Sequence, residues 1–267
     1  IMDSLKFRQI LTPAIIGKAT QGTIFCGGLS HIYGNDDSVW GVIISARCDI
    51  ANAKAPVYYY LPIVKWEDFK KIELPDIIIE NAINSEKKSL KKALLKANLS
   101  DSIVDINLEV ADRKTLIENI QDKNQRNNLQ KKFQHLDSLT NCDRKNTNAL
   151  LELCKDTINN IFTDLSENKN ASYYLIEDKD TGVLVVRLRE LRRISPHFMK
   201  SLGNGIQAPF KESSMIKSEI ATLDDGDLYM PLYNMKSPYI EHLIQRYVYQ
   251  FDRVGVDNFH SNLLTLR

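Results

Sequence analysis

The hydrophobic and polar positions near the N-terminus predict a series of short strands. Gln21–Cys26 favours one strand, and Val39–Ser45 is too apolar and too rich in β-branched residues to be half exposed, which predicts a strand buried on both faces. A second β-rich run begins at Val57, and we expect Pro62 to close it because proline cannot donate a ladder hydrogen bond. The sequence therefore predicts a compact β unit over residues 21–66.

The centre of this unit is predicted to be a hairpin built on Val42–Ser45 and Val57–Ile63. Cys48 and Asp49 lie in the connection between these two runs, where Asn52 and its neighbours are typical of turns. A connection held by a rigid hairpin is a position from which side chains are often presented into a functional site.

Helical spacing replaces the strand pattern from about Asn81 to Leu165, and the composition shifts to Lys, Asn, Leu and Glu. Apolar residues near a 3.6-residue period define three faces, and so predict three helices. The polar stretch Gln121–Gln130 is expected to interrupt them, and Asp137–Asn148 is expected to be a connection. The residues of the three faces are Leu90, Leu94 and Ala97; Leu116, Ile117 and Ile120; and Leu150, Cys154, Ile158, Ile161 and Leu165.

Strand patterning returns after this helical region. Tyr173–Glu177, a turn over Asp178–Gly182 and a strand over Val183–Leu191 predict a second hairpin. Further on, Met215–Leu223 fits either a short helix or an edge strand.

A C-terminal amphipathic helix is predicted over residues 237–254. Ser237 and Pro238 fit a side-chain cap followed by proline at the first helical position, and Gly255 is the natural stop. One apolar stripe runs along this helix through Ile240, Leu243, Ile244, Tyr247, Val248, Phe251 and Val254.

These elements predict an α+β chain. Residues 1–81 are expected to supply the N-terminal part of a β-barrel, residues 82–168 a helical insertion, and residues 169–267 the returning hairpin and the terminal helix that complete the core. This organisation requires the two β segments to contact each other across the insertion.

Composition adds few constraints. The chain of 267 residues is 43% hydrophobic and 26% charged, which is ordinary for a globular protein. With 35 basic and 34 acidic side chains, any attraction to nucleic acid must come from a local patch. The four cysteines show no CxxC spacing, and neither a signal peptide nor a membrane-spanning run is apparent. We expect a cytoplasmic protein that does not enter a membrane.

The first candidate site is catalytic and consists of Cys48, Asp49 and Arg47. A nucleophilic cysteine needs a lowered pKa, usually from a nearby histidine or cation. Arg47 is adjacent in sequence, although adjacent strand residues point to opposite faces, and no histidine is close in sequence. The alternative interpretation makes Cys48 a small buried side chain and Asp49 a turn cap.

The second candidate site is a basic cluster formed by Arg187, Arg189, Arg192 and Arg193. Arg187 and Arg189 are expected on one face of their strand, and phosphate contact is the natural functional interpretation. The alternative is an exposed structural edge whose charge is neutralised by acidic neighbours such as Glu190.

The third candidate is the polar face of the terminal helix, where His242, Arg246 and Tyr249 have a spacing that permits one shared surface. A solvated helix face has the same pattern. The five histidines are scattered and phosphate-binding fingerprints are absent, so we expect no metal and no cofactor.

The segments QGTIF and WGVIISARCDIANAKAPVYYYLPIV resemble the small barrel of PemK/MazF-like toxins over about residues 20–66. The resemblance implies a small SH3-like β-barrel and, in that family, ribonuclease activity. The family's Arg-Pro pair and catalytic threonine are replaced here by Trp40-Gly41 and Ile63-Val64.

We therefore expect a bacterial binding or accessory module, of a toxin–antitoxin or antiviral defence system, that contacts nucleic acid, a protein partner or a second copy of itself. The alternatives are a divergent metal-independent endoribonuclease that uses Asp49 and Arg47, and a cysteine-dependent enzyme that uses Cys48.

Overall fold

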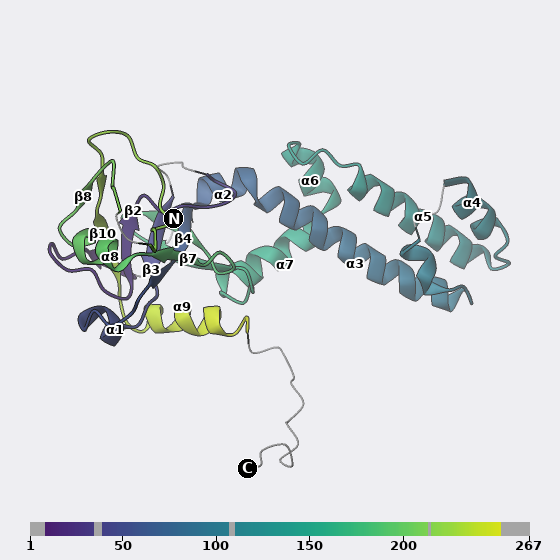
Figure 1. Ribbon diagram of the computed structural model, residues 1–267. Helices are drawn as coiled ribbons and strands as arrows, with labels where there is room; N and C mark the ends of the chain where they lie inside the picture. The colour runs from purple at the N-terminus through teal and green to yellow at the C-terminus, as the bar shows by residue number, and fades with distance from the viewer. Residues whose placement is uncertain (1–8, 35–38, 107–109, 213–214, 252–267) are drawn as a thin grey trace, which may run out of the picture. The chain divides into compact units, whose positions relative to one another are not determined.

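A computed structural model of the chain describes residues 9–34, 39–106, 110–212 and 215–251 (Figure 1). The chain divides into two compact units. The first, here called the β unit, comprises residues 1–66 and 167–267, and the second, the helical unit, comprises residues 67–166.

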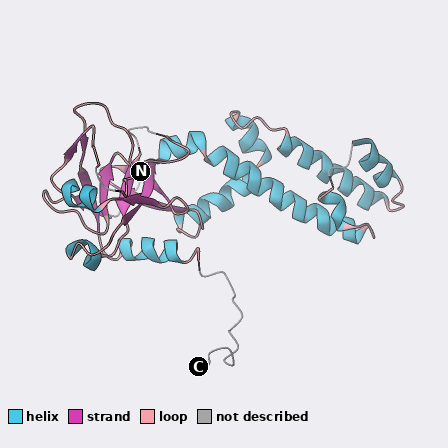
Figure 2. Cartoon of the chain, viewed as in Figure 1, coloured by secondary structure: helices cyan, strands magenta, loops and turns pink. Residues whose placement is uncertain are grey.

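The β unit is built on one curled antiparallel sheet that forms a half-barrel (Figure 2). The strands follow the order β1-β10-β2-β3-β4-β6-β5, and β7 pairs with β4 beside β6. Their bounds are β1 (Leu11–Pro13), β2 (Thr23–Cys26), β3 (Trp40–Ile43), β4 (Tyr58–Lys65), β5 (Tyr173–Asp178), β6 (Gly182–Arg187), β7 (Arg192–Ile194) and β10 (Pro231–Met235). The α+β class is confirmed.

The strand β4 joins the two β segments that are distant in sequence. On one side it pairs with β3, with Ile63 opposite Trp40, which confirms the predicted hairpin. On the other side its first half pairs with β7 and its second half with β6, where Ile63 lies opposite Val186. The predicted contact across the helical region is therefore confirmed.

The prediction that Pro62 closes this strand is wrong, because β4 continues through it to Lys65. The pairing with β7 covers Tyr58–Tyr60 and the pairing with β6 covers Ile63–Lys65. Pro62 falls between these two ladders, where neither β6 nor β7 requires its missing N–H.

Two clusters of buried apolar side chains stabilise the sheet. In one, Ile24, Leu61 and Val186 of the sheet pack with Ile240 and Leu243 of helix α9 (Tyr239–Val248). In the other, the rings of Phe25 and Phe198 meet edge to face with centroids 5.9 Å apart, where Phe198 belongs to helix α8 (Pro196–Leu202). Gly41 is required nearby, because a Cβ there would lie 2.6 Å from the rings of Phe25 and Tyr60.

The terminal helix α9 begins and ends differently from the prediction. Pro238, rather than Ser237, is the N-cap residue, and in the described residues no side-chain hydrogen bond caps it. The helix ends at Val248, and Gly255 lies outside the described residues. The predicted stripe is buried only at its N-terminal end, since Val248 and Phe251 are exposed.

Three smaller elements complete the β unit. They are helix α1 (Arg47–Ala51) and the paired strands β8 (Ile206–Gln207) and β9 (Leu228–Tyr229). The described part of Met215–Leu223 contains neither helix nor strand, so both alternatives for that segment are wrong.

The helical unit contains more helices than the three that were predicted. They are α2 (Trp66–Ile72), α3 (Leu74–Lys96), α4 (Val110–Glu118), α5 (Lys123–Thr140), α6 (Thr147–Leu153) and α7 (Lys155–Ser166), with a short 3₁₀ turn at Asp101–Val104. The predicted interruption at Gln121–Gln130 is confirmed only at its start, because α4 ends at Glu118 and α5 begins at Lys123. The rest of this polar stretch is the start of α5, which the carboxylate of Asp122 caps by accepting hydrogen bonds from the backbone of Asn124 and Gln125. Leu90, Leu94, Leu129 and Phe133 form the core of this unit.

Candidate nucleic-acid interface

A buried carboxylate holds half of the predicted arginine cluster. Glu190 follows β6 and is 8% exposed, and its side chain pairs with both Arg187, at 2.9 Å, and Arg192. It also accepts hydrogen bonds from the hydroxyl of Ser30 (2.9 Å) and the backbone N–H of His31 (2.6 Å). Two of the four predicted arginines are thus held in an internal network.

The pKa of Glu190 reflects a balance between burial and these partners. Burial alone raises the pKa, but the N–H of His31, the two guanidinium groups and the hydroxyl of Ser30 together bring it below the ordinary value of 4.5. The carboxylate therefore stays ionised and neutralises its neighbours. The side chains of Arg187 and Arg192 are only 13% and 7% exposed, which leaves them little surface for a ligand.

The two remaining arginines differ from each other. Arg193 is exposed but forms an ion pair with Glu219, with 3.2 Å between Nε and Oε1. Arg189 is exposed and makes no ion pair within the part of the chain that the structure describes. The predicted shared strand face is wrong, because β6 ends at Arg187 and Arg189 lies beyond it.

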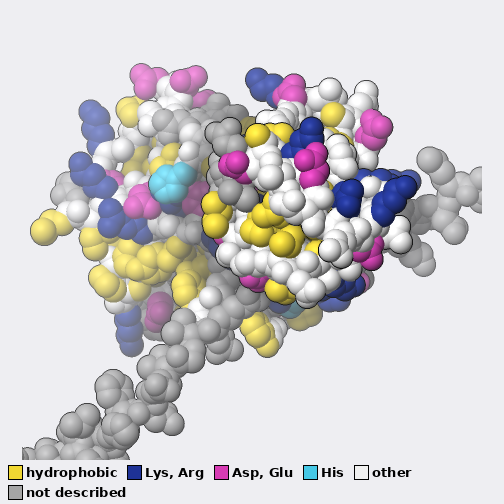
Figure 3. Space-filling view, turned by 90° about the vertical axis from the view of Figure 1, so that its right-hand side faces the viewer, with side chains coloured by type: hydrophobic (Ala, Val, Ile, Leu, Met, Phe, Trp, Pro, Cys, Tyr) yellow, Lys and Arg dark blue, Asp and Glu magenta, His cyan; other side chains and the backbone are white. Residues whose placement is uncertain are grey.

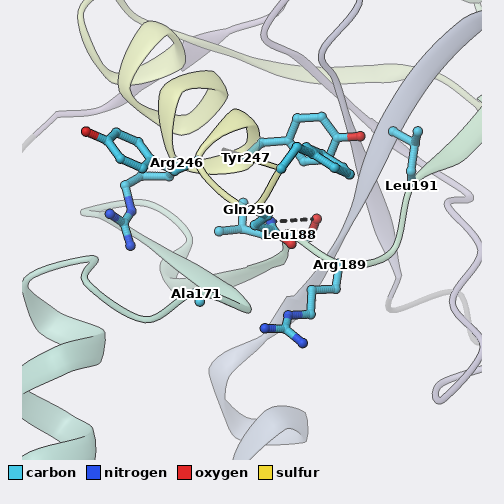
Figure 4. A pocket seen from close by; sticks show the side chains of 9 residues that line it. Ala171, Leu188, Arg189, Leu191, Arg246, Tyr247 and Gln250 are labelled. Carbon is cyan, nitrogen blue, oxygen red and sulfur yellow. Dashed lines mark hydrogen bonds between the residues drawn. The ribbon is translucent and has the colours of Figure 1, made fainter. Parts of the chain in front are cut away.

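Arg189 lines a cavity of about 570 Å³, which is called the arginine pocket below (Figure 4). Its other walls come from the connection between β6 and β7, from Ala171 before β5, and from the C-terminal end of α9 with the residues that follow it. The amide of Gln250 donates a hydrogen bond of 3.1 Å to the carbonyl of Leu188, which ties these segments together. The principal side chains of the pocket are Arg189, Arg246, Tyr247, Tyr249, Gln250 and Phe251.

Arg246 supplies a second positive charge to the arginine pocket. Its guanidinium donates hydrogen bonds to the carbonyls of Lys169 (2.8 Å) and Asn170, and its Cζ lies 6.0 Å from the ring centre of Tyr249. The buried Nε of Arg246 has no hydrogen-bond partner among the described residues. Carbonyl oxygens orient the guanidinium but do not cancel its charge, and no described residue that lines the pocket is acidic.

The predicted helix-face site is thus divided. Arg246 and Tyr249 reach the arginine pocket, but His242 does not line it. The imidazole Nδ1 of His242 instead lies 3.2 Å from the hydroxyl of Tyr174 in β5. Burial raises the pKa of Tyr174 to about 12, so this hydroxyl keeps its proton at neutral pH.

Two aromatic residues of the arginine pocket were not predicted as site residues from the sequence. Tyr247 and Phe251 were assigned to the core-facing stripe, but their rings, 5.4 Å apart, line the cavity. The sequence signal that could have identified them as site residues is the length of the apolar stripe of α9, which extends beyond the two positions of the helix that are buried.

The predicted catalytic residues Arg47, Cys48 and Asp49 lie together on α1, and all three are exposed. Arg47 pairs with Glu241 of α9 at 3.0 Å, and the thiol of Cys48 lies 3.7 Å from the carboxylate of Asp49. The interpretation of Cys48 as a buried side chain is therefore wrong. A cavity beside α1 is lined by Ile50 and the two residues around Asn52, but neither Cys48 nor Asp49 lines it.

On the face shown in Figure 3, Lys and Arg are interspersed with Asp, Glu and hydrophobic side chains. Within the described ranges, no three His, Cys, Asp or Glu side chains come together in a way that could hold a metal ion. No helix in those ranges combines the length and the apolar character needed to cross a bilayer.

Comparison of the chain with known protein families, with curated proteins and with solved structures found no match. The geometry of the arginine pocket is accordingly the basis for a functional proposal.

Proposed function

We propose that the β unit binds single-stranded nucleic acid in the arginine pocket. Arg189 and Arg246 contact phosphate groups, and the rings of Tyr247, Tyr249 and Phe251 stack on bases. The observation that carries this proposal is the difference between Arg189 and its neighbours: Arg187, Arg192 and Arg193 each have a carboxylate partner, and Arg189 has none among the described residues.

Guanidinium groups and aromatic rings in one cavity suit this class of ligand. Single strands are bound by a positive groove that follows the backbone and by aromatic side chains on which bases stack, at about 1–3 kcal/mol per base. A duplex hides its bases in its own stack and offers no such contact. Small-molecule pockets measure roughly 300–1,000 Å³, so the cavity of about 570 Å³ has room for a nucleotide unit.

The half-barrel fold leads to a second, broader proposal about the class of protein. We propose that the half-barrel is a divergent form of the SH3-like barrel of PemK/MazF-like toxins, and that the protein is a cytoplasmic accessory module of a bacterial toxin–antitoxin or antiviral defence system. In support, the segments that resemble the family form the adjacent strands β2, β3 and β4. The residues at its catalytic positions include Gly41 and Ile63, both buried strand residues, which favours binding over cleavage.

The test compares two arginines that differ in their partners. Binding of a short fluorescent single-stranded RNA is measured by anisotropy for the wild type, Arg189→Gln and the matched control Arg193→Gln. We expect Arg189→Gln to weaken binding about tenfold, equivalent to about 1.4 kcal/mol. We also expect it to lower the slope of log K against log salt by about 0.7, as loss of one phosphate contact requires for a single strand.

The control variant Arg193→Gln is expected to bind like the wild type, because Glu219 already neutralises that charge. Equal binding by wild type and Arg189→Gln, or stronger binding of a duplex than of the single strand, contradicts the proposal. The same RNA is run on a denaturing gel after incubation, and its cleavage by the wild type points to the ribonuclease alternative.

A further inference from the structure

A second cavity of about 470 Å³ lies on the β unit, and none of its lining residues belongs to the arginine pocket. Its walls come from the segment before β2, from the end of α1, from the first residue of β4 and from α8. The residues that define it are Lys18, Ile50, Tyr58, His197, Met199 and Lys200, and it is called the lysine pocket below.

The charge of the lysine pocket is positive. Lys18 and Lys200 are both exposed, and neither makes an ion pair within the described residues. The described residues that line the cavity include no Asp or Glu. The imidazole of His197 stacks on Phe210, with ring centres 5.4 Å apart and planes at 15°, which fixes a further polar group at the rim. Two uncompensated ammonium groups at one cavity favour a doubly charged anion.

A backbone contact brings together the segments that carry the two lysines. The N–H of Gly17 donates a 2.8 Å hydrogen bond to the carbonyl of Gly203, which directly follows α8. A Cβ on Gly203 would lie 2.8 Å from the carbonyl carbon of Gly17 and 2.9 Å from the N of Lys18. The segment that carries Lys18 is therefore in direct contact with the end of the helix that carries Lys200.

The remaining wall is apolar. Tyr58 and Met199 are buried, and Ile50 is partly buried in the cluster that contains them. The hydroxyl of Tyr58 is occupied by a 3.3 Å hydrogen bond to the carbonyl of Asp49, so its ring rather than its polar group is the surface offered to a ligand. The cavity thus combines an apolar side with a cationic edge.

We propose that the lysine pocket binds a phosphate monoester that has an apolar or aromatic body. The dianionic phosphate lies between Lys18 and Lys200, and the body packs on Ile50, Tyr58 and Met199. Lysine is a common phosphate ligand as a compact point charge, and the volume lies within the ordinary range for small-molecule sites. The proposal is independent of nucleic-acid binding, because the two cavities share no residue.

The experiment uses phenyl phosphate as the probe and titrates it into the full chain by calorimetry. Inorganic phosphate tests the charge alone and phenol tests the ring alone. We expect phenyl phosphate to bind more tightly than either. The double variant Lys18→Gln/Lys200→Gln should weaken its binding about tenfold or more. The control Lys179→Gln changes an exposed lysine in the β5–β6 turn and should leave binding unchanged.

The proposal is overturned by the absence of any heat of binding for phenyl phosphate, by equal affinity for phenyl phosphate and phenol, or by equal affinity for phenyl phosphate and inorganic phosphate. Unchanged binding in the double lysine variant also overturns it. Thermal unfolding of each variant shows whether it is folded. A conservative Lys18→Arg/Lys200→Arg variant, which keeps both charges, should retain binding and so separates a charge effect from a folding defect.

Discussion

The backbone N–H of Leu11 in β1 donates a 3.0 Å hydrogen bond to the carboxylate of Asp178 in β5, two residues that are 167 positions apart in the chain. β1 and β5 are the two ends of the curled sheet, so this bond joins its edges. The carboxylate of Asp178 is buried and also accepts a hydrogen bond from the backbone N–H of Asp180 at the β5–β6 turn. One side chain thus satisfies a donor on the opposite edge and orders its own turn.

Replacement of Asp178 should destabilise the β unit. In Asp178→Ala the N–H of Leu11 loses its acceptor in a buried position, and the cost of such an unsatisfied donor is about 1–3 kcal/mol. Urea unfolding monitored by circular dichroism measures this loss. The matched change Asp180→Ala keeps the backbone N–H and should cost less than half as much. Equal free energies of unfolding for the two variants would show that the Leu11–Asp178 bond does not hold the sheet edges.

The buried network at Glu190 leads to a second prediction. Glu190→Gln removes the buried carboxylate charge that pairs with both Arg187 and Arg192, and breaking a buried pair in this way costs about 3–5 kcal/mol. The comparison Glu219→Gln affects a more exposed carboxylate that pairs with Arg193 at 3.2 Å and with Arg192 only at 3.8 Å, and it should cost about 0–1 kcal/mol. The free energy of unfolding of each variant is measured at neutral pH, and a larger loss for Glu219→Gln would contradict this account.

The same network predicts the response to acid. Because the folded state holds the pKa of Glu190 below its ordinary value of 4.5, the ionised carboxylate stabilises the fold above that pH, and this contribution is lost as the pH falls below it. The variant Glu190→Gln lacks the titrating group and should lose less stability than the wild type over this acid range. Parallel stability curves for the two proteins would refute the assignment.

Tyr174 predicts a matching effect at high pH. Burial raises its pKa to about 12 from the ordinary 10.0, so the folded state favours the neutral phenol. Its contribution to stability is complete below pH 10.0 and declines as the pH rises from there toward 12. Tyr174→Phe should reduce the loss of stability over this range, whereas Tyr249→Phe, at an exposed position, should leave it unchanged. Unfolding free energies over this range give the comparison.

The sequence was sufficient to predict the elements whose pattern of apolar residues is determined by burial. The apolar runs of β3 and β4 and the β5–β6 hairpin were located correctly, because a strand buried among neighbours must be apolar along its length. Their ends were not, since β4 continues past Pro62 and β6 ends at Arg187 rather than Leu191. The two β segments pair through β4, as the predicted organisation required.

Features that depend on distant partners could not be predicted from local pattern. Pro62 fits inside β4 only because two different strands share one side of it, and Arg187 and Arg189 differ only because Glu190 is turned toward the interior. The capping bond of Asp122 shows a related limit, since a polar stretch and the exposed first turns of a helix have the same composition.

The candidate site was predicted in part. Arg189, Arg246 and Tyr249 were named from the sequence, and the structure places them around one cavity, but it separates them from His242 and from Cys48 and Asp49. Nothing in local spacing indicates that the end of α9 meets the connection after β6. These two segments are joined by the hydrogen bond between Gln250 and Leu188, which are 62 positions apart in the chain.

The most direct test of nucleic-acid binding in the arginine pocket is photo-crosslinking with a single-stranded RNA that carries thiouridine, followed by mass spectrometry of the attached peptides. We expect the crosslinks to fall on the segment that contains Tyr247, Tyr249 and Phe251, Arg189→Gln to reduce them sharply, and Arg193→Gln to leave them unchanged. Crosslinks confined to the helical unit, or an unaltered pattern in Arg189→Gln, would contradict it.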